Sequence, residues 1–178
     1  MLVGNNVRIR PMEKKDLELF YDWMSSQESV GCFSDAIMTY KEPFIERLET
    51  ALKDKNKLYT IIEDSDANPI GMISYSDVVG SPSALEIGIL IGKSSARGNG
   101  LGRESLDLFV KHIFTTKPII RIQFLTRADN AGMRAIGEKV GFVLEGVLRK
   151  YKYVQGDYRD FCIMAITREE WNLKNSPM

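Results

Sequence analysis

The sequence contains little cysteine and histidine, and it lacks a long apolar run. Its two cysteines, Cys32 and Cys162, lie far apart and match no zinc spacing or redox pair, which favours free thiols in a reducing compartment. Its one histidine, His112, excludes a metal site built from several histidines. No apolar run approaches the roughly 18 residues that a membrane-spanning helix needs, and the first residues lack the pattern of a signal peptide. These absences predict a metal-free, cytoplasmic chain that does not associate with a membrane.

An excess of charge of one sign is also missing, because 24 lysine and arginine residues face 24 aspartate and glutamate residues. Proteins that bind nucleic acid by neutralising its phosphates usually carry a basic excess, so we expect no nucleic-acid partner. The length of 178 residues, 44% of them hydrophobic, predicts a single domain over residues 1–178. Such a domain buries roughly 70% of its extended surface and needs no disulfide or metal to fold.

Apolar periodicity predicts strands and helices in the order βααβββαβαββ. Period-two or continuous apolar runs predict strands at Val7–Arg10, Leu58–Glu63, Ile70–Val78, Ala84–Ile91, Ile119–Thr126, Phe142–Val154 and Tyr158–Ile166. Helical spacing predicts helices over residues 17–24, 42–52, 103–114 and 130–140. Thr39 and Glu42 have the spacing of a capping box before the second helix, and Gly141 should end the fourth. The order predicts an α/β (α+β) fold with a mixed, mostly antiparallel sheet and helices on both faces.

The segment Ala96–Arg103, with the sequence ARGNGLGR, carries three alternating glycines into the third predicted helix. Glycines let the backbone approach a ligand, and the amides of a helix N-terminus bind anions. Arg97 and Arg103 flank the glycines and can add charge-assisted hydrogen bonds to phosphate. The P-loop pattern is absent, and the dinucleotide pattern would need glycine at position 103. A diphosphate is therefore the predicted ligand, and a loop that only serves helix–strand packing is the alternative.

The pattern Arg97-x-x-Gly100-x-Gly102 matches the Arg/Gln-x-x-Gly-x-Gly/Ala signature of the GNAT superfamily of N-acetyltransferases. The order of elements is similar to that of the family, and the resemblance extends from about Val7 to Trp171. Further segments that resemble the family are Leu85–Gly88, Asn130 and Glu138–Phe142. Glu145–Arg149 and Gly156–Asp160 are similar to the branch that includes ribosomal-protein N-terminal acetyltransferases and polyamine acetyltransferases.

This resemblance implies acetyl-CoA as cosubstrate, no metal, and direct transfer of acetyl to a primary amine in a ternary complex. It implies that the backbone of Leu90, Ile91 and Gly92 runs beside pantetheine, with one amide facing the thioester carbonyl. It assigns the diphosphate to Arg97, Gly98, Asn99, Gly100, Leu101, Gly102 and Arg103. The amide of Asn130 would hydrogen-bond pantetheine, and an ordinary helix cap is its alternative role. Family members are often dimers, so a homodimer is an expected assembly.

The acid and base of the reaction depart from the family pattern. The tyrosine of many members falls at Gly137, and the serine of the ribosomal-protein branch falls at Met133. Glu86, in a mostly apolar strand, is the candidate general base, either directly or through water, and a salt bridge to an arginine of a neighbouring strand is its structural alternative. Tyr151 is the candidate hydroxyl acid. The other proton donors considered are Tyr153, Ser74, Tyr75 and water.

The acceptor is predicted from the cost of presenting a neutral amine. At pH 7 this cost is about 1 kcal/mol for an α-amine and roughly 4–5 kcal/mol for a lysine-like amine. Because no catalytic dyad is recognisable, the sequence favours an α-amine of a protein or peptide, or a small amine. Carboxylates in the region expected to shape the acceptor site keep polyamines, diamines, amino sugars and aminoglycosides open; they are Glu28, Asp35, Glu42 and Glu46. Because the tyrosine and the serine of the family are absent, a module that binds acyl-CoA without catalysis is the alternative function.

Overall fold

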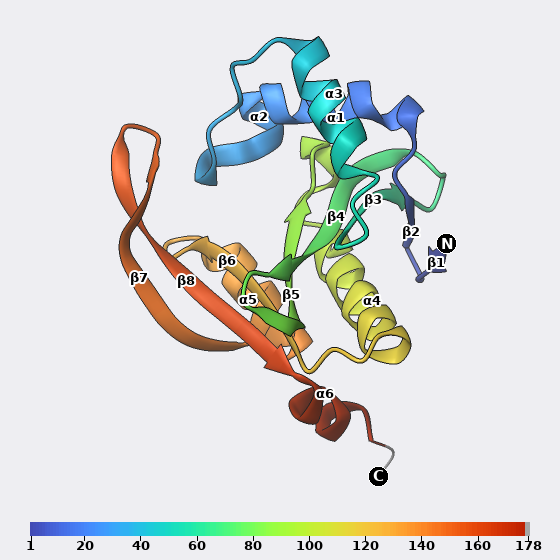
Figure 1. Ribbon diagram of the computed structural model, residues 1–178, viewed down its shortest axis with the longest axis vertical. Coiled ribbons are helices and arrows are strands. Elements are labelled where there is room, and N and C mark those ends of the chain that lie inside the picture. Colours follow the sequence, from blue (N-terminus) through green and yellow to red (C-terminus); the bar gives the residue numbers. More distant parts are fainter. Residues whose placement is uncertain (177–178) are drawn as a thin grey trace.

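The computed structural model describes residues 1–176, which form a twisted eight-stranded sheet with helices packed against it (Figure 1). The strands are β1 (Leu2–Val3), β2 (Val7–Pro11), β3 (Lys57–Asp64), β4 (Pro69–Val78), β5 (Ser81–Leu90), β6 (Arg121–Arg127), β7 (Val143–Val154) and β8 (Asp157–Thr167). Their order in the sheet is β1-β2-β3-β4-β5-β6-β8-β7, and only β5 and β6 are parallel. This arrangement confirms the predicted mixed, mostly antiparallel sheet. Strand β5 lies near its centre.

The helices are α1 (Leu17–Ser25), α2 (Gln27–Val30), α3 (Lys41–Ala51), α4 (Leu101–Thr116), α5 (Ala131–Val140) and α6 (Arg168–Asn175). The four predicted helices are confirmed as α1, α3, α4 and α5. Gly141 ends α5 in the left-handed conformation, with φ of 113°. The predicted capping box before α3 is wrong. Tyr40 is the N-cap of α3, and the carbonyl of Thr39 instead accepts a hydrogen bond of 2.8 Å from the hydroxyl of Tyr21.

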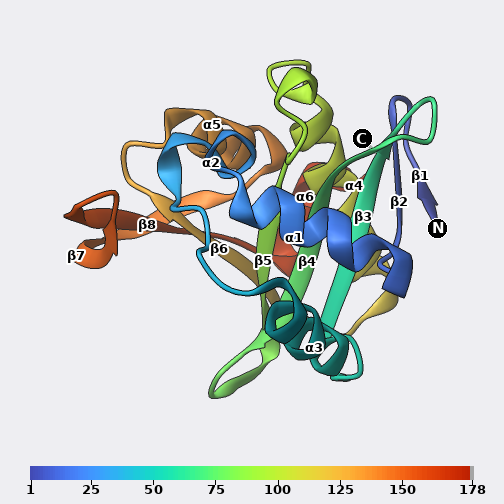
Figure 2. The same ribbon diagram turned by 90° about the horizontal axis from the view of Figure 1, so that it is seen from above.

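Two hydrophobic cores lie on opposite faces of the sheet. Ile61 and Met72 belong to the core beneath α1 and α3, whereas their chain neighbours Ile62 and Ile73 belong to the core beneath α4 and α5. This alternation is expected because successive side chains of a strand point to opposite faces. Figure 2 shows α1 crossing β3, β4 and β5, in agreement with its packing against that face. Helices therefore cover both faces, as predicted. Within residues 1–176, no helix has both the length and the apolar character needed to cross a membrane.

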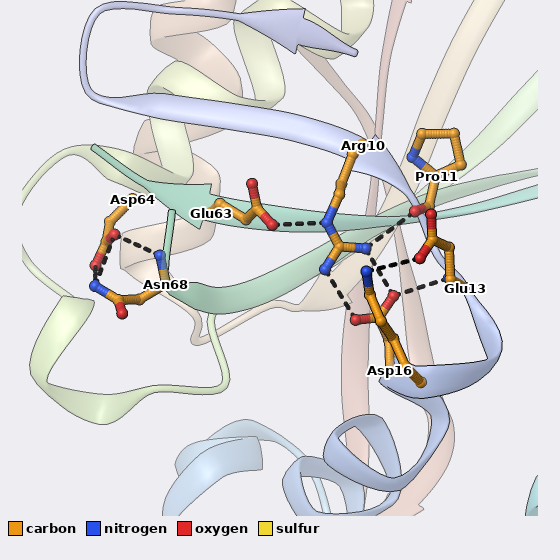
Figure 3. A network of polar contacts seen from close by, with 8 residues as sticks. Arg10, Pro11, Glu13, Asp16, Glu63, Asp64 and Asn68 are labelled. Atoms are coloured by element: carbon orange, nitrogen blue, oxygen red, sulfur yellow. Dashed lines mark hydrogen bonds and ion pairs between the residues drawn. The ribbon is translucent and has the colours of Figure 1, made fainter. Parts of the chain in front are cut away.

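A buried ion-pair network fixes the start of α1 against the sheet (Figure 3). Arg10 on β2 donates to Glu63 on β3 at 2.6 Å, and to both carboxylate oxygens of Asp16 at 2.7 and 2.9 Å. The Asp16 carboxylate also accepts a hydrogen bond of 2.8 Å from the backbone N–H of Glu13. Burial raises the pKa of Asp16, but the hydrogen bonds from Arg10 and Glu13 outweigh burial and hold that pKa below its usual value.

The parallel strands β5 and β6 part after a short stretch. They pair only where Ala84–Glu86 lie beside Arg121–Gln123. Beyond this point β5 stays paired with β4, and β6 stays paired with β8. The two strands therefore leave an opening between residues 87–90 and residues 124–127, which we call the splay.

Candidate functional site

The backbone at the end of β5 is irregular on the edge of the splay. Met72 lies opposite Leu90, whereas the N–H of Lys93 donates to the carbonyl of Ile70 at 3.0 Å. Two residues after Leu90 therefore oppose one residue of β4, which is the pattern of a β-bulge and leaves a residue without a ladder partner. At the opposing position, Gly71, a Cβ would collide with the carbonyl oxygen of Leu90. The bulge thus leaves one of residues 91–92 without a partner on β4, next to Leu90 at the edge of the splay.

The glycine loop forms one wall of a cavity of about 450 Å³. Gly98 and Gly100 have φ of 78° and 79°, and a Cβ on either residue would meet nothing within 4 Å. Gly100 is the N-cap of α4, so the amides of the first turn of this 16-residue helix have no intrahelical acceptor. The opposite wall is the face of α5 that carries Met133, Ile136 and Lys139. The cavity combines an apolar wall with the amides and dipole of a helix N-terminus, a combination that suits an anion.

Arg97 lines this cavity, and its guanidinium is hydrogen-bonded to backbone carbonyls. Its guanidinium donates to the carbonyl of Ile91 at 2.9 Å, to that of Glu28 at 2.9 Å, and to that of Ser29. These three bonds tie the bulge of β5 to the short helix α2. Arg97 therefore braces the loop, and its predicted contact with phosphate beside Arg103 stays a prediction.

The other predicted loop residues have distinct positions. Arg103, in the first turn of α4, is exposed and lines the 450 Å³ cavity, as does Lys139. The side-chain amide of Asn99 donates to the carbonyl of Ser95 at 3.3 Å and so stays within the loop. Leu101 packs against the core beneath α4. Gly102 lines the cavity, and a Cβ at this position would lie 3.6 Å from the side chain of Ile91.

A second cavity, of about 260 Å³, lies in the splay itself and adjoins the first, because Ile89 and Met133 line both. Its roof is the segment around Phe33 and Ser34, which Arg127 holds in place. Arg127 is only 7% exposed and donates to the carbonyl of Cys32 at 3.0 Å, while its Cζ lies 5.3 Å from the centre of the Phe33 ring.

Asp129 completes the anchor of this roof. Arg127 donates to its two carboxylate oxygens at 2.9 and 2.5 Å, and these hydrogen bonds hold the pKa of Asp129 below its usual value. No local pattern of the sequence indicates the role of Arg127, because Cys32 and Phe33 lie almost 100 residues earlier in the chain. The splay cavity thus has a charged anchor at its edge, and polar and apolar surface line it in similar amounts.

Asn130 lines the splay cavity, and its side-chain oxygen already accepts a hydrogen bond. It accepts from the N–H of Met133 at 3.1 Å and so caps α5, while its amide nitrogen donates to the Thr126 hydroxyl at 3.2 Å. The alternative role as a helix cap is therefore confirmed. Because the amide group also lines the splay cavity, the cap and a contact with a ligand are compatible.

Glu86 lies half-buried on the sheet face that also carries Ser74 and Ser76, in a third cavity of about 420 Å³. Its carboxylate accepts a hydrogen bond of 3.0 Å from the amide of Gln123. The arginine of the neighbouring strand, Arg121, pairs with Glu145 instead, at 2.6 and 2.5 Å, so the predicted alternative of a salt bridge to Glu86 is wrong. The hydrogen bonds from Arg121 lower the pKa of Glu145.

The third cavity adjoins the splay cavity, because Ile87, Gly88 and Leu125 line both. Glu86 is therefore next to the opening between the strands, with its carboxylate on the side away from α4. A carboxylate in this position can take a proton from a group that reaches the splay from the α1 and α3 face.

The structure does not bring Tyr151 to these cavities. Its side chain is 55% exposed on β7, and its ring packs on Phe161 with the centroids 5.6 Å apart. At Gly137, where many family members carry tyrosine, a Cβ would lie 2.7 Å from the ring of Phe124. Close packing of α5 on β6 therefore explains why this position has no side chain. Among residues 1–176, no three His, Cys, Asp or Glu side chains are grouped as a metal site would require.

Comparison with known proteins agrees with this geometry. Residues 6–143 match the family model described as acetyltransferase (GNAT) domain. The chain is 26% identical over 177 residues to the probable N-acetyltransferase YjcK of Bacillus subtilis, covering 93% of this chain and 96% of that protein. It is 25% identical over 176 residues to the putative ribosomal N-acetyltransferase YdaF of the same species, covering 95% of each.

A solved structure shares the fold. The spermidine N-acetyltransferase of Vibrio cholerae, in complex with CoA and spermine, superimposes with a TM-score of 0.83 at 20% identity. The match covers 93% of this chain and 97% of that one. At this identity the likeness concerns the fold alone.

Proposed function

The chain belongs to the acetyltransferase (GNAT) family, and from this premise we propose that it transfers acetyl from acetyl-CoA directly to a primary amine in a ternary complex. The acceptor that we propose is the α-amine of a peptide or protein. The observation that carries the proposal is the continuous pair of cavities between the glycine loop, α5 and the splay. They join an anion site at a helix N-terminus to unpaired backbone at the end of β5.

The residues of the first cavity fit the diphosphate of acetyl-CoA. The open sides of Gly98 and Gly100 let the phosphates approach the amides of the loop and of the first turn of α4. Arg103 and Lys139 supply positive charge, and the apolar faces of Met133 and Ile136 suit the uncharged pantetheine arm. The amide of Asn130, at the end of this route, is the proposed partner of pantetheine.

The chemistry follows from the bulge and from Glu86. Acetyl-CoA supplies a thioester carbonyl, whose oxygen gains negative charge as the amine attacks. An amide of Leu90–Gly92 that has no ladder partner can donate to this oxygen and stabilise the charge. Glu86 takes the proton of the amine, directly or through water, as the N–C bond forms and the C–S bond breaks. A thiol has an ordinary pKa of about 8.5, so the sulfur can leave as a thiolate without a residue assigned as acid.

The distribution of carboxylates supports an α-amine over a polyamine. Glu28 accepts a hydrogen bond of 2.5 Å from Ser94, and Asp35 accepts one of 3.0 Å from the backbone of Gln155. The other two carboxylates that suggested a polyamine as acceptor, Glu42 and Glu46, lie exposed on α3. None of these four carboxylates lines a cavity described above. A polycation would therefore meet one carboxylate, Glu86, beside the splay.

The test is thiol release from acetyl-CoA with a panel of amines, together with calorimetric titration of acetyl-CoA. The panel holds peptides with different N-termini, spermidine, diamines, aminoglycosides and amino sugars. Binding of acetyl-CoA with amine-dependent release supports the proposal. Binding without release with any amine would favour the acyl-CoA-binding module, and absence of binding would refute the cofactor assignment. A single domain, a cytoplasmic location and a homodimer stay predictions.

A further inference from the structure

An apolar groove of about 660 Å³ lies between α1 and α3, outside the cavities assigned to acetyl-CoA. Aromatic and aliphatic side chains line it, among them Phe20, Met24, Phe44, Leu48 and Tyr59. The rings of Phe20 and Phe44 lie 5.9 Å apart, centroid to centroid. Met38 forms part of the rim and is 103% exposed, although exposure of a large apolar side chain costs free energy. The groove can therefore bury an apolar group of a ligand.

The groove continues into the cavity that holds Glu86, because Tyr59 lines both. Tyr59 on β3 pairs with Ser74 on β4, which in turn pairs with Gly88 on β5. Neighbouring strands are about 4.8 Å apart, so Tyr59 lies about 10 Å across the sheet from Gly88 at the splay. An extended peptide rises about 3.3 Å per residue, and a peptide whose amine is at the splay would thus reach Tyr59 at about its third residue.

The charges along this route are basic rather than acidic. Arg47 lines the groove, where its Nε donates to the carbonyl of Pro43 at 3.3 Å. Lys57 lines the Glu86 cavity, and its Nζ lies 3.5 Å from a carboxylate oxygen of Asp54. Among the described residues lining the groove, the Glu86 cavity and the splay cavity, Glu86 is the one carboxylate. The ion pair with Asp54 offsets the charge of Lys57, so the repulsion that disfavours a polycation along the groove comes from Arg47. An uncharged or acidic chain meets no such repulsion.

We propose, on the basis of the function proposed above, that the groove between α1 and α3 selects peptide N-termini with a large apolar side chain at positions two to four. The amine lies at the splay beside Glu86, the backbone follows the line from Gly88 to Tyr59, and the apolar side chain enters the groove. Arg47 disfavours basic residues in the same stretch.

The experiment is a leucine scan of the acceptor. Peptides of serine and alanine carry one leucine at position one, two, three, four or six, and thiol release from acetyl-CoA gives kcat/KM for each. We expect leucine at one of positions two to four to raise kcat/KM about tenfold over leucine at position six, since a buried leucine side chain contributes this much to discrimination. Spermidine should be a poorer acceptor than the best peptide.

Two variants of the rim separate the groove from the rest of the surface. In Met38→Asp we expect the tenfold advantage of the well-placed leucine to fall to within about twofold, because a carboxylate replaces the apolar rim. Val79→Asp is the matched control, since Val79 is also fully exposed, at 101%, and lies in the β4–β5 turn away from the groove. Its preference for leucine should equal that of the parent protein.

Arg47→Glu tests the charge of the groove independently of its apolar rim. The change reverses one charge beside the acceptor path, and we expect kcat/KM for spermidine to rise about tenfold relative to that for the best peptide.

The outcomes separate the two proposals. Acetylation of peptides without any dependence on the leucine position, or an advantage that survives Met38→Asp, would overturn the groove assignment and leave the proposed function intact. Spermidine as the better acceptor of the parent protein would also overturn the groove assignment. Absence of release with every peptide and amine would overturn both.

Discussion

A carboxylate at Gly100 should weaken the binding of acetyl-CoA while the fold survives. A side chain at this position fits sterically, because a Cβ there would meet nothing within 4 Å. The left-handed backbone, with φ of 79°, costs a non-glycine residue about 1 kcal/mol. An aspartate is also compatible with the N-terminus of α4, whose dipole favours a negative charge. Gly100→Asp is therefore expected to fold with a melting temperature lowered by about 2–4 °C.

The loss of affinity follows from the charge. A carboxylate about 4 Å from a phosphate is repelled by about 4 kcal/mol at an effective dielectric constant of 20, and by about 1 kcal/mol in water. The dissociation constant for acetyl-CoA should thus rise at least about fivefold and up to about a thousandfold. Calorimetric titration with acetyl-CoA measures this change, and raising the salt concentration should reduce it.

Gly80→Asp is a closely matched control. Gly80 has φ of 80°, a Cβ there meets nothing within 4 Å, and the residue lies in the turn between β4 and β5, away from the loop. Gly80→Asp introduces the same charge and the same backbone strain as Gly100→Asp. The melting temperature of the Gly80→Asp protein should therefore fall by a similar amount, while its affinity for acetyl-CoA stays that of the parent protein. Equal affinities of the Gly100→Asp and Gly80→Asp proteins would refute the assignment of the loop.

Three further expectations concern single ionisable groups. Glu86→Gln should lower turnover about a hundredfold without changing acetyl-CoA affinity, and an unaltered rate profile from pH 6 to 9 would contradict its role as base. Asp16→Asn should lower the free energy of unfolding by about 3 kcal/mol at pH 7, because Arg10 loses a buried partner. Since the pKa of Asp16 is lowered in the fold, its stabilising effect is present above about pH 4 and lost as the pH falls through the folded value. A stability difference between parent and variant in urea unfolding that does not narrow as the pH falls below about 4 would disprove this. Burial and then the charge of Lys117 lower the pKa of His112, so the parent protein should lose stability as the pH falls below about 6.5, and His112→Gln should lose less.

The sequence predicts most of the fold because its periodicities are local. The alternation of strand residues and the helical spacing were sufficient to place the main elements in order. The elements that were missed are short or terminal: β1 has two residues, α2 has four, and α6 follows the last predicted strand. The helix α6 had a readable signal, since Thr167 and Glu170 form a capping box. The false capping box at Thr39 has the same residue spacing, but there Tyr40 caps the helix.

The site is predictable only where its residues are neighbours in the chain. The glycine loop and the cap formed by Asn130 are local patterns, and both are where the sequence places them. Arg97 belongs to the same motif, yet its partners on α2 lie 68 and 69 residues away, so its bracing role depends on tertiary packing. The splay and its anchor Arg127 depend on strand pairing, which no local pattern encodes.

The most direct test of the acetyltransferase assignment is a mass measurement of a peptide acceptor after incubation with the protein and acetyl-CoA, with released thiol measured in the same reaction. We predict one added acetyl group on the peptide α-amine and one thiol released for each group transferred. Peptides with a blocked N-terminus should gain nothing. Thiol release at the same rate with and without acceptor, and no gain in mass on any amine, would contradict the account.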